Sequence, residues 1–411
     1  MGIFKSYARY RYGNDEGELN MLTMDKVTLT DKWVLIREDF NVPMKDGKIA
    51  HSARIDAAIP TLNKALSKGA KVIVMSHLGR PKEGQFDATL SLAPIAEYLR
   101  KVLGQPIPLF TLGSPVPALR SGEIALLENI RFLEGEEANS EVLAKKLASL
   151  CDIFVMDAFA VAHRAQASTV GVAQFAPIAC AGPLLQAELQ AIEHVLVAPQ
   201  RPVVAIVGGS KISTKLKLLR NILDKVDTLV VGGGIANTFL AACGMPVGES
   251  LYEQPLVTTA KEMLSDAQKQ GKTIWLPTDV VVGHTLADNQ QGEVKDCSQV
   301  QGADKIFDIG PQSQLSLAKL IGQAKTVLWN GPVGVFECAP FAQGTQSLAK
   351  AIVASKAFSV AGGGDTLAAI EQFGVQDKIS YLSTGGGAFL EALEGHALPA
   401  VAILELRSNE K

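Results

Sequence analysis

The feature that most constrains the fold is a repeated alternation of short apolar runs and segments with helical periodicity. Each run is rich in β-branched residues and ends in a polar or glycine-rich loop, and a helical pattern such as that of residues 92–104 then follows. This alternation is typical of parallel strands joined by crossover helices, so it predicts an α/β fold. The expected strands are residues 33–40, 71–78, 123–130, 152–159, 202–209, 227–234, 326–332, 358–364 and 378–387.

The length of the chain predicts two domains, because 411 residues exceed the usual size of one domain. Gly182 and Pro183 interrupt the chain near its middle, and a helical pattern then extends to about residue 197. We therefore expect two doubly wound, Rossmann-like parallel-sheet domains joined by a helix over 182–197.

Composition limits the partners of the chain. The net charge is −3, so no overall positive field attracts nucleic acid or an anionic membrane. The five cysteines include no C-x-x-C pair, which favours a reducing compartment. Two long uncharged runs, 165–187 and 228–248, contain Gly, Asn, Gln or Pro, and we interpret them as buried soluble structure. The opening MGIFKS fits the loose myristoylation pattern, but one acyl chain anchors only marginally.

The two halves differ in the residues that follow their strands. Ligands of open parallel sheets bind beyond the carboxyl ends of the strands. In the first half, arginines lie at or after the predicted strand ends, namely Arg37, Arg54, Arg80, Arg131 and Arg164. A single arginine is usually solvated or in a surface ion pair. Their shared position favours a site for a small ligand with several negative charges, because guanidinium groups bind carboxylate and phosphate oxygens in pairs.

Polar residues beside these arginines fit the same site. His77 and Arg80 flank Gly79 in SHLGRP, and a histidine in this position is a candidate substrate contact. Asp39 and Asn41 could hydrogen-bond a hydroxyl group of the ligand, or they could cap a turn before the following proline. The spacing leaves both possibilities open.

The second half contains glycine-rich loops suited to phosphate. Gly208 and Gly209 let the backbone approach an anion at a helix N-terminus, and Lys211 and Lys215 are expected to lie on one helix face. The alternative is an amphipathic helix with a solvated lysine face. The segment lacks the G-x-x-x-x-G-K-[ST] motif, and no G-x-G-x-x-G follows a strand. Asp365, at a predicted helix start, is either an N-cap or a Mg²⁺ ligand.

Taken together, these motifs resemble the phosphoglycerate kinase family. The resemblance is carried, in order and from about residue 26 to 407, by REDFNVP, SHLGRP, ENIRF, DAFAVAHRA, VGGSK, GGGIANTF, LWNGPVGVFE, AGGGDT and STGGGAFLE. It implies two α/β domains across a cleft and reversible phosphoryl transfer between 1,3-bisphosphoglycerate and ADP, which gives 3-phosphoglycerate and ATP. The implied domains are 25–183, with 398–411 packing back on it, for phosphoglycerate, and 184–397 for the Mg²⁺–nucleotide.

The resemblance also assigns roles to individual residues. Substrate binding is implied for Arg37, Asp39, Phe40, Asn41, Arg54, His77, Leu78, Gly79, Arg80, Arg131, His163 and Arg164. Nucleotide binding is implied for Gly209, Lys211, Lys215, Gly233, Asn330, Glu337, Gly363, Gly364, Asp365 and Thr366, with Asp365 as the Mg²⁺ contact. The groups expected to act on the transferred phosphoryl group are Arg54, Lys211, Gly364 and Gly386. A cytoplasmic monomer, without nucleic-acid or membrane partners, is the family expectation.

Three departures from the family pattern stand out. Ala160 and Val161 replace a glycine and a threonine, for which we expect altered affinity and retained activity. Glu38 replaces an apolar or small residue, and its side chain should point away from its neighbours if the strand continues. Residues 1–24 form an extension outside the family pattern that need not be ordered.

Two other functional classes fit parts of the sequence. A dehydrogenase could use similar sheets, although the dinucleotide fingerprint is missing. A non-catalytic phosphate-binding or scaffolding protein would have an inactive site. The presence of Arg54, Lys211 and Asp365 disfavours this alternative.

Overall fold

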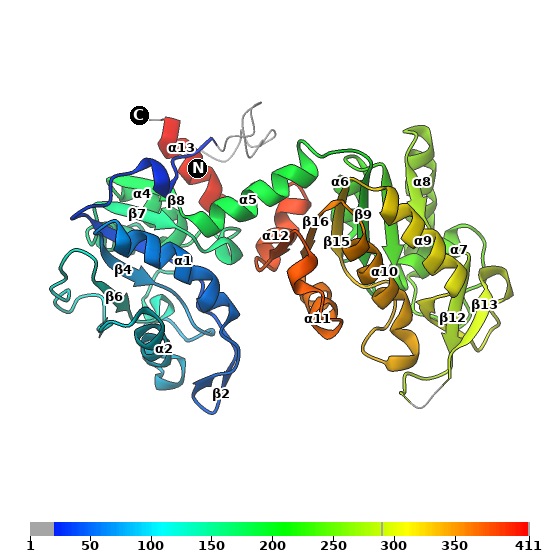
Figure 1. Ribbon diagram of the computed structural model, residues 1–411, viewed down its shortest axis with the longest axis horizontal. Coiled ribbons are helices and arrows are strands. Elements are labelled where there is room, and N and C mark those ends of the chain that lie inside the picture. The colour runs from blue at the N-terminus through cyan, green and yellow to red at the C-terminus, as the bar shows by residue number, and fades with distance from the viewer. Residues whose placement is uncertain (1–19, 289–290, 410–411) are drawn as a thin grey trace. The chain divides into compact units, whose positions relative to one another are not determined.

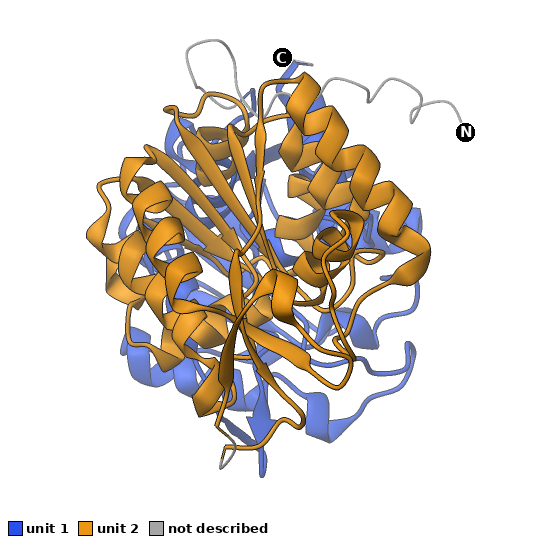
Figure 2. Cartoon of the chain, turned by 90° about the vertical axis from the view of Figure 1, so that its right-hand side faces the viewer, with its two compact units in different colours: residues 1–190, 397–411 blue, residues 191–396 orange. Residues whose placement is uncertain are grey.

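The computed structural model describes residues 20–288 and 291–409, which divide into two compact units (Figure 2). Unit 1 comprises the described residues up to Gln190 together with those from Ala397 onward, and unit 2 comprises Ala191–His396. The division falls inside helix α5 (Pro183–Leu196), seven residues later than the expected boundary at 183/184. The first turn of α5 stays with unit 1 because Asp157 accepts hydrogen bonds from the amides of Leu184 (2.8 Å) and Leu185 (3.0 Å).

Unit 1 is built on a six-stranded parallel sheet with the order β5-β6-β4-β1-β7-β8 (Figure 1). Its strands are β1 (Trp33–Arg37), β4 (Lys71–Met75), β5 (Leu109–Phe110), β6 (Ile124–Leu127), β7 (Ile153–Met156) and β8 (Ile178–Ala181). Its helices are α1 (Ala53–Ser67), α2 (Ala93–Leu103), α3 (Glu141–Ala148), α4 (Val172–Phe175) and α13 (Pro399–Asn409). The central strands are apolar along almost their whole length because helices cover both faces of such a sheet.

Unit 2 repeats this design with a second six-stranded parallel sheet, in the order β11-β10-β9-β15-β16-β17. Its strands are β9 (Val203–Gly208), β10 (Thr228–Gly232), β11 (Thr273–Trp275), β15 (Thr326–Asn330), β16 (Phe358–Gly362) and β17 (Tyr381–Ser383). Its helices are α6 (Leu216–Leu223), α7 (Gly233–Ala242), α8 (Val257–Lys269), α9 (Pro311–Gln323), α10 (Gln343–Ala354), α11 (Gly364–Gln372) and α12 (Gly387–Leu393). The predicted α/β class with two parallel sheets is confirmed.

Several strands were not predicted from the sequence. A three-stranded antiparallel sheet in unit 2 has the order β13-β12-β14, made by Glu293–Asp296, Asp279–Gly283 and Lys305–Ile309. A hairpin of β2 (Met44–Lys45) and β3 (Lys48–Ile49) and the short strands β5, β8 and β11 were also missed. Strands β2, β3 and β5 have only two residues each, and β13 is mostly polar and exposed, so these strands give no clear apolar run in the sequence.

Segments from both ends of the chain pack on unit 1. Leu22 accepts a hydrogen bond from the amide of Ala181 (2.8 Å), and its own amide donates to Ser408 of α13 (2.7 Å). Met21 and Met24 are buried. Of the extension expected over residues 1–24, residues 21–24 therefore pack on unit 1, and residues 1–19 lie outside the described residues.

The two uncharged runs are parts of the two units. Residues 165–187 form α4, β8, the start of α5 and a π-helical turn, Ala167–Gly171, and residues 228–248 form β10 and α7. Among residues 20–288 and 291–409, no helix is both long and apolar enough to cross a membrane.

Candidate active site

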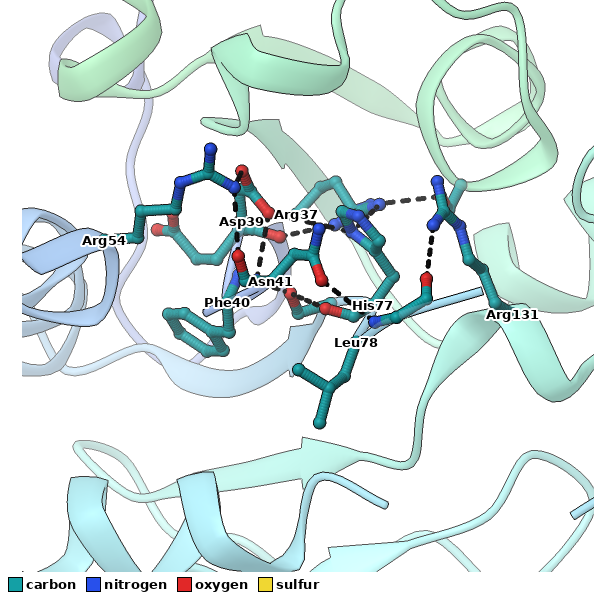
Figure 3. A network of polar contacts seen from close by, with 12 residues as sticks. Arg37, Asp39, Phe40, Asn41, Arg54, His77, Leu78 and Arg131 are labelled. Atoms are coloured by element: carbon teal, nitrogen blue, oxygen red, sulfur yellow. Dashed lines mark hydrogen bonds and ion pairs between the residues drawn. The ribbon is translucent and has the colours of Figure 1, made fainter. Parts of the chain in front are cut away.

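Unit 1 gathers most of its candidate residues at the carboxyl edge of its sheet (Figure 3). Arg37 ends β1, and Asp39, Phe40 and Asn41 follow it; His77, Leu78, Gly79 and Arg80 follow β4; Arg131 lies in a short turn after β6; and His163 and Arg164 follow β7. Arg54 approaches the same residues from the first turn of α1. Parallel strands bring these distant segments together because their carboxyl ends meet at one edge.

Arg37 is completely buried and makes polar contacts on three sides. Its Nε donates to the Ser168 hydroxyl (3.0 Å), Nη1 donates to the Glu38 carbonyl, and Nη2 lies 3.3 Å from His77 Nδ1. Burial lowers the pKa of Arg37, while the nearby carboxylates act in the opposite direction.

His77 is held neutral by its surroundings. Burial, followed by the positive charge of neighbouring guanidinium groups, lowers the pKa of His77 well below its ordinary value. Those groups belong to Arg37, Arg131, Arg164 and Arg54. Four of the five arginines selected from the sequence therefore surround one imidazole, and a neutral histidine among them can still donate a hydrogen bond to an anion.

Asp39 and Asn41 arrange the loop after β1 and contact Arg54. Arg54 Nη1 donates to Asp39 Oδ2 (2.9 Å) and to the Asn41 carbonyl (3.0 Å), and the Asn41 side-chain oxygen accepts from the amide of Gly79 (2.9 Å). The Asp39 carboxylate also accepts from the amide of Asn41 (3.1 Å), so it does cap a turn as the alternative interpretation proposed. The turn-capping interpretation is therefore confirmed for Asp39, and the contact of this pair with a ligand hydroxyl stays a prediction.

The remaining candidates of unit 1 differ in exposure. Phe40 and Leu78 are buried and serve the core. Arg131 Nη1 donates to the Gly79 carbonyl, and Arg164 Nε donates to His163 Nε2 (3.3 Å). Arg80 is exposed. Asn129, which lies in ENIRF but was not selected, ties the loops together by donating to the carbonyls of Leu78 and Leu90, both at 2.8 Å.

Two departures from the family pattern fall close to this cluster. Strand β1 ends at Arg37, so the strand rule for the Glu38 side chain does not apply. The Glu38 carboxyl is buried beside Asp157, and burial, followed by the charge of Asp157, raises its pKa well above the ordinary value. The Val161 side chain is buried in the core, and the Val161 carbonyl accepts from the amide of Arg164 (3.0 Å).

In unit 2, Lys215 connects three strand ends. Its Nζ donates to the Gly208 carbonyl of β9 (2.7 Å) and to Asn330 Oδ1 at the end of β15 (2.9 Å). Asn330 in turn donates to the Gly362 carbonyl at the end of β16 (2.7 Å). Burial lowers the pKa of Lys215, and the negative charge of Asp365 acts in the opposite direction.

The expectation that Lys211 and Lys215 share a helix face is wrong. Helix α6 begins at Leu216, so both lysines precede it, and Lys215 is its N-cap residue. The turn ahead of α6 bends the chain so that Lys215 reaches back to Gly208, whereas Lys211 is exposed. Periodicity failed here because Ser213 is bound by Glu253, through both its amide (2.7 Å) and its hydroxyl (2.6 Å), in a non-helical turn.

Glycines place helix starts next to this lysine. Gly363 precedes α11 with φ +100°, and a Cβ there would lie 2.9 Å from the Asn330 amide nitrogen. Gly364 and Asp365 open α11, while the buried Thr366 accepts from the amide of Gly331 (2.7 Å). Gly233 begins α7 with φ +64°, and its Cβ would lie 2.8 Å from the Gly209 carbonyl. Helix N-termini with free amides are suited to phosphate.

Two further candidates of unit 2, Gly386 and Glu337, take no part in the hydrogen bonds described above for Lys215 and Asn330. Gly386 precedes α12 with φ +50°, after the edge strand β17. Glu337 is exposed in the loop after β15. Among the described residues no cluster of three or more His, Cys, Asp or Glu side chains could hold a metal ion.

Comparison with known proteins decides the family. Residues 24–396 match the phosphoglycerate kinase family. The chain belongs to the phosphoglycerate kinase family. A phosphoglycerate kinase of Francisella tularensis subsp. tularensis is 54% identical over 387 residues, which cover 94% of this chain and 99% of the relative. The enzyme of Francisella tularensis subsp. novicida has the same identity and coverage.

Solved phosphoglycerate kinases share the fold. The structure from Coxiella burnetii has a TM-score of 0.92 and 51% identity, covering 94% of this chain and all of that one. The structure from Pyrococcus horikoshii has a TM-score of 0.79 and 32% identity, with coverages of 95% and 100%. The function supported by the family and these relatives is that of a phosphoglycerate kinase, so the chain is an enzyme of the kinase class and the resemblance seen in the sequence is confirmed.

Proposed function

We propose that the chain transfers a phosphoryl group reversibly between 1,3-bisphosphoglycerate and ADP, with phosphoglycerate bound by unit 1 and the nucleotide by unit 2. One observation carries this assignment: the basic cluster around His77 and the lysine–glycine group around Lys215 lie in different units, each at the carboxyl edge of its own sheet. The first suits a small, highly charged acid and the second suits a polyphosphate.

In unit 1, the substrate is proposed to replace internal contacts that the cluster now makes with itself. The guanidinium groups of Arg54, Arg131 and Arg164 would bind the carboxylate and phosphate oxygens. Asp39 and Asn41 would accept and donate hydrogen bonds at the hydroxyl group of the phosphoglycerate substrate. His77, Arg80, His163 and the amides of Leu78 and Gly79 complete the proposed contact set, and the buried Arg37 contacts His77 within it.

In unit 2, backbone amides are proposed to carry most of the binding. Gly209, Gly233, Gly363 and Gly364 allow close approach of the phosphates, and Lys215 supplies a positive charge held by Asn330. Lys211 would reach the transferred phosphoryl group. Thr366 would help to order the loop after β15 by its contact with Gly331, and Glu337 would contact the ribose. These roles follow the family and fit a site at the N-terminus of α11.

Magnesium fits this site as part of a complex with the nucleotide. Mg²⁺ prefers oxygen ligands and commonly uses one or two carboxylates together with phosphates and water. Asp365, in the first turn of α11, offers that single carboxylate. When bound, the ion would neutralise phosphate charge, while the residues of the chain orient the two reactants.

Direct transfer needs in-line placement and stabilisation of the charge on the moving group. Arg54 and Lys211 are proposed to act on that charge, and the amides near Gly364 and Gly386 supply fixed dipoles. An acyl phosphate donates to ADP without a general base, because no proton leaves the accepting phosphate oxygen. The phosphoglycerate substrate bound to unit 1 and the nucleotide bound to unit 2 must meet, and α5, which contributes to both units, is the proposed hinge.

We also propose that the enzyme works as a cytoplasmic monomer on small molecules, without nucleic-acid or membrane partners. The slightly negative net charge and the absence of C-x-x-C pairs in the sequence support this setting. Size-exclusion chromatography with light scattering would test the oligomeric state.

A coupled assay of ATP consumption with 3-phosphoglycerate, with and without Mg²⁺, tests the activity. We expect turnover only when all three are present. Calorimetry then tests the assignment of the sites: Arg131→Ala should weaken phosphoglycerate binding alone, and Lys215→Ala should weaken nucleotide binding alone. Heat from neither ligand, or loss of both in one variant, would contradict the proposal.

A further inference from the structure

Beneath the basic cluster of unit 1 lies a buried carboxylate that has no assigned role. Glu136 is completely buried, and both of its oxygens are bound by Ser168: the Ser168 amide donates to Oε2 (2.9 Å) and the Ser168 hydroxyl donates to Oε1. Ser168 is itself completely buried in the π-helical turn Ala167–Gly171. A buried carboxylate must have such partners, because an uncompensated charge would be very costly.

The Ser168 hydroxyl joins Glu136 to Arg37. A hydroxyl has one proton and two lone pairs; here the proton points to Glu136, so a lone pair is left to accept from Arg37 Nε at 3.0 Å. The negative charge of Glu136 is also the largest electrostatic influence that favours the charged form of Arg37. Glu136 therefore both neutralises the buried guanidinium group and fixes its direction.

Arg37 passes this orientation on to His77. Its Nη2 lies 3.3 Å from His77 Nδ1 and can only donate, so Nδ1 must accept. A neutral imidazole that accepts at Nδ1 has its proton on Nε2. The Asp39 carboxylate, 3.8 Å from Nδ1, is too distant to compete for a proton there. The remaining donor of the imidazole is thus its Nε2–H group, which is not bound by Glu136, Ser168 or Arg37.

We propose that Glu136, acting through Ser168 and Arg37, is a positioning residue that holds His77 as the neutral Nε2–H tautomer, ready to donate to the anionic substrate. The inference rests on the proposed function, because His77 is a proposed substrate contact. Glu136 and Ser168 are completely buried and are not expected to touch substrate. The charged groups around the imidazole, in addition to Arg37, are Arg54, Arg131, Arg164 and Asp39.

The test compares Glu136→Gln with Glu97→Gln, an exposed glutamate of α2 in the same unit. Glutamine keeps the size and one acceptor oxygen but removes the charge. We expect Glu136→Gln to raise the KM for 3-phosphoglycerate about tenfold, the scale of losing one hydrogen bond to a charged group, and to leave the KM for ATP within about twofold. Glu97→Gln should change neither constant.

A second measurement reads the tautomer directly. In ¹⁵N spectra of histidine-labelled enzyme, with the His77 signals assigned from His77→Gln, the wild type should show a protonated Nε2 and an unprotonated Nδ1. Glu136→Gln should shift His77 toward a mixture of tautomers. Ser168→Ala, which removes the bridging hydroxyl, should give the same two changes and serves as the test if Glu136→Gln does not fold.

Three results would overturn the proposal. One is an unchanged KM for phosphoglycerate with an unchanged His77 spectrum in both variants. Another is an equal loss of affinity for both substrates, which would indicate a merely structural role. The third is a wild-type His77 protonated at Nδ1. The spectrum does not depend on turnover, so an enzyme without phosphoglycerate kinase activity would refute the proposed function and still report the tautomer.

Discussion

Side chains form the candidate site of unit 1, whereas backbone groups form most of that of unit 2. The cluster of unit 1 consists of guanidinium groups around a buried imidazole and is held together by contacts among its own members. The loops of unit 2 place glycines at helix starts, with Lys215 and Asn330 as the polar side chains that join them. Both sites use the carboxyl edge of a parallel sheet.

The difference follows from the size and charge of the two proposed ligands. A small acid with several charges offers oxygens in all directions, and long side chains can converge on it from four strands. A nucleotide is larger and brings its own cation, so the protein needs space and oriented amides more than further positive charge. Substitutions should therefore act on the two sites in different ways: lost charge matters most in unit 1, and added bulk matters most in unit 2.

The largest effect is expected from Arg54→Ala. Arg54 bridges Asp39 and the Asn41 carbonyl and is the guanidinium group proposed to act on the moving phosphoryl group. We expect turnover to fall about 10³-fold or more, the scale of arginine groups at phosphoryl transition states. A coupled assay measures this, with Arg100→Ala, an exposed arginine of α2, as the control. A loss below about tenfold would remove Arg54 from that role.

The next largest effect is expected at Lys215, the half-buried lysine that precedes α6 in unit 2. Lys215→Ala removes the charge that Asn330 and the Gly208 carbonyl hold in place, so nucleotide affinity should fall about 10–100-fold, the range for losing one charge-assisted contact. Lys217→Ala, in the exposed first turn of α6, should have little effect. Calorimetry with ATP and with 3-phosphoglycerate checks this; a change in phosphoglycerate affinity alone would reverse the assignment of the two units.

A smaller effect is expected from bulk in a glycine loop. In Gly363→Ala the new methyl group would meet the Asn330 amide at 2.9 Å in a backbone conformation with φ +100°. We expect a loss of about 1–3 kcal/mol in the free energy of unfolding, together with weaker nucleotide binding. Gly374→Ala is the matched control, because it has φ +63° with no atom within 4 Å and so carries backbone strain alone. Equal binding losses in the two variants would show that the Asn330 contact is unimportant.

The smallest effect on activity is expected from a carboxyl group outside both candidate sites, which makes the stability of unit 1 depend on pH. Burial raises the pKa of Glu405, on α13, from 4.5 to about 7. The folded state therefore binds a proton that the unfolded state has released, so this group lowers stability as the pH rises from about 4.5 to above 7. Glu405→Gln should be more stable than the wild type by about 1–3 kcal/mol at pH 8 and nearly equal to it at pH 4.

Urea denaturation at both pH values measures that difference. Glu262→Gln, an exposed substitution on α8 in unit 2, is the control and should leave the pH profile unchanged. Parallel profiles for Glu405→Gln and the wild type would show that the carboxyl group is hydrated in the folded protein.

Much of this architecture could be predicted from local patterns. The nine expected strands correspond to β1, β4, β6, β7, β9, β10, β15, β16 and β17, because long β-branched runs followed by breaks leave a strong signal. Their order in the sheets could not be predicted, since pairing depends on contacts between distant segments. The antiparallel sheet around β12 was missed because its partner β13 has mostly exposed, polar residues.

The candidate sites were predictable where a charged residue follows a strand, and much less so where burial decides the role. His77 and Arg131 meet as their shared strand-end position indicated, whereas Arg54 joins them from the first turn of α1. Nothing in the sequence near Glu136 or Ser168 distinguishes them from surface residues, and only the folded chain brings Ser168, in the π-helical turn, into contact with both Glu136 and Arg37. The lysine pair was misplaced for the same reason, since a side-chain contact from Glu253 keeps its turn out of the helix.

Helix α13 has a consequence for the order in which the protein is made. It completes unit 1 with residues from Ala397 onward, and there the amide of Ala400 binds the Ala162 carbonyl (3.1 Å) while Arg407 caps the end of α4 through the carbonyls of Gln174 and Ala176. During synthesis, the half that leaves the ribosome first must therefore wait, unfinished, until the half that follows it has emerged.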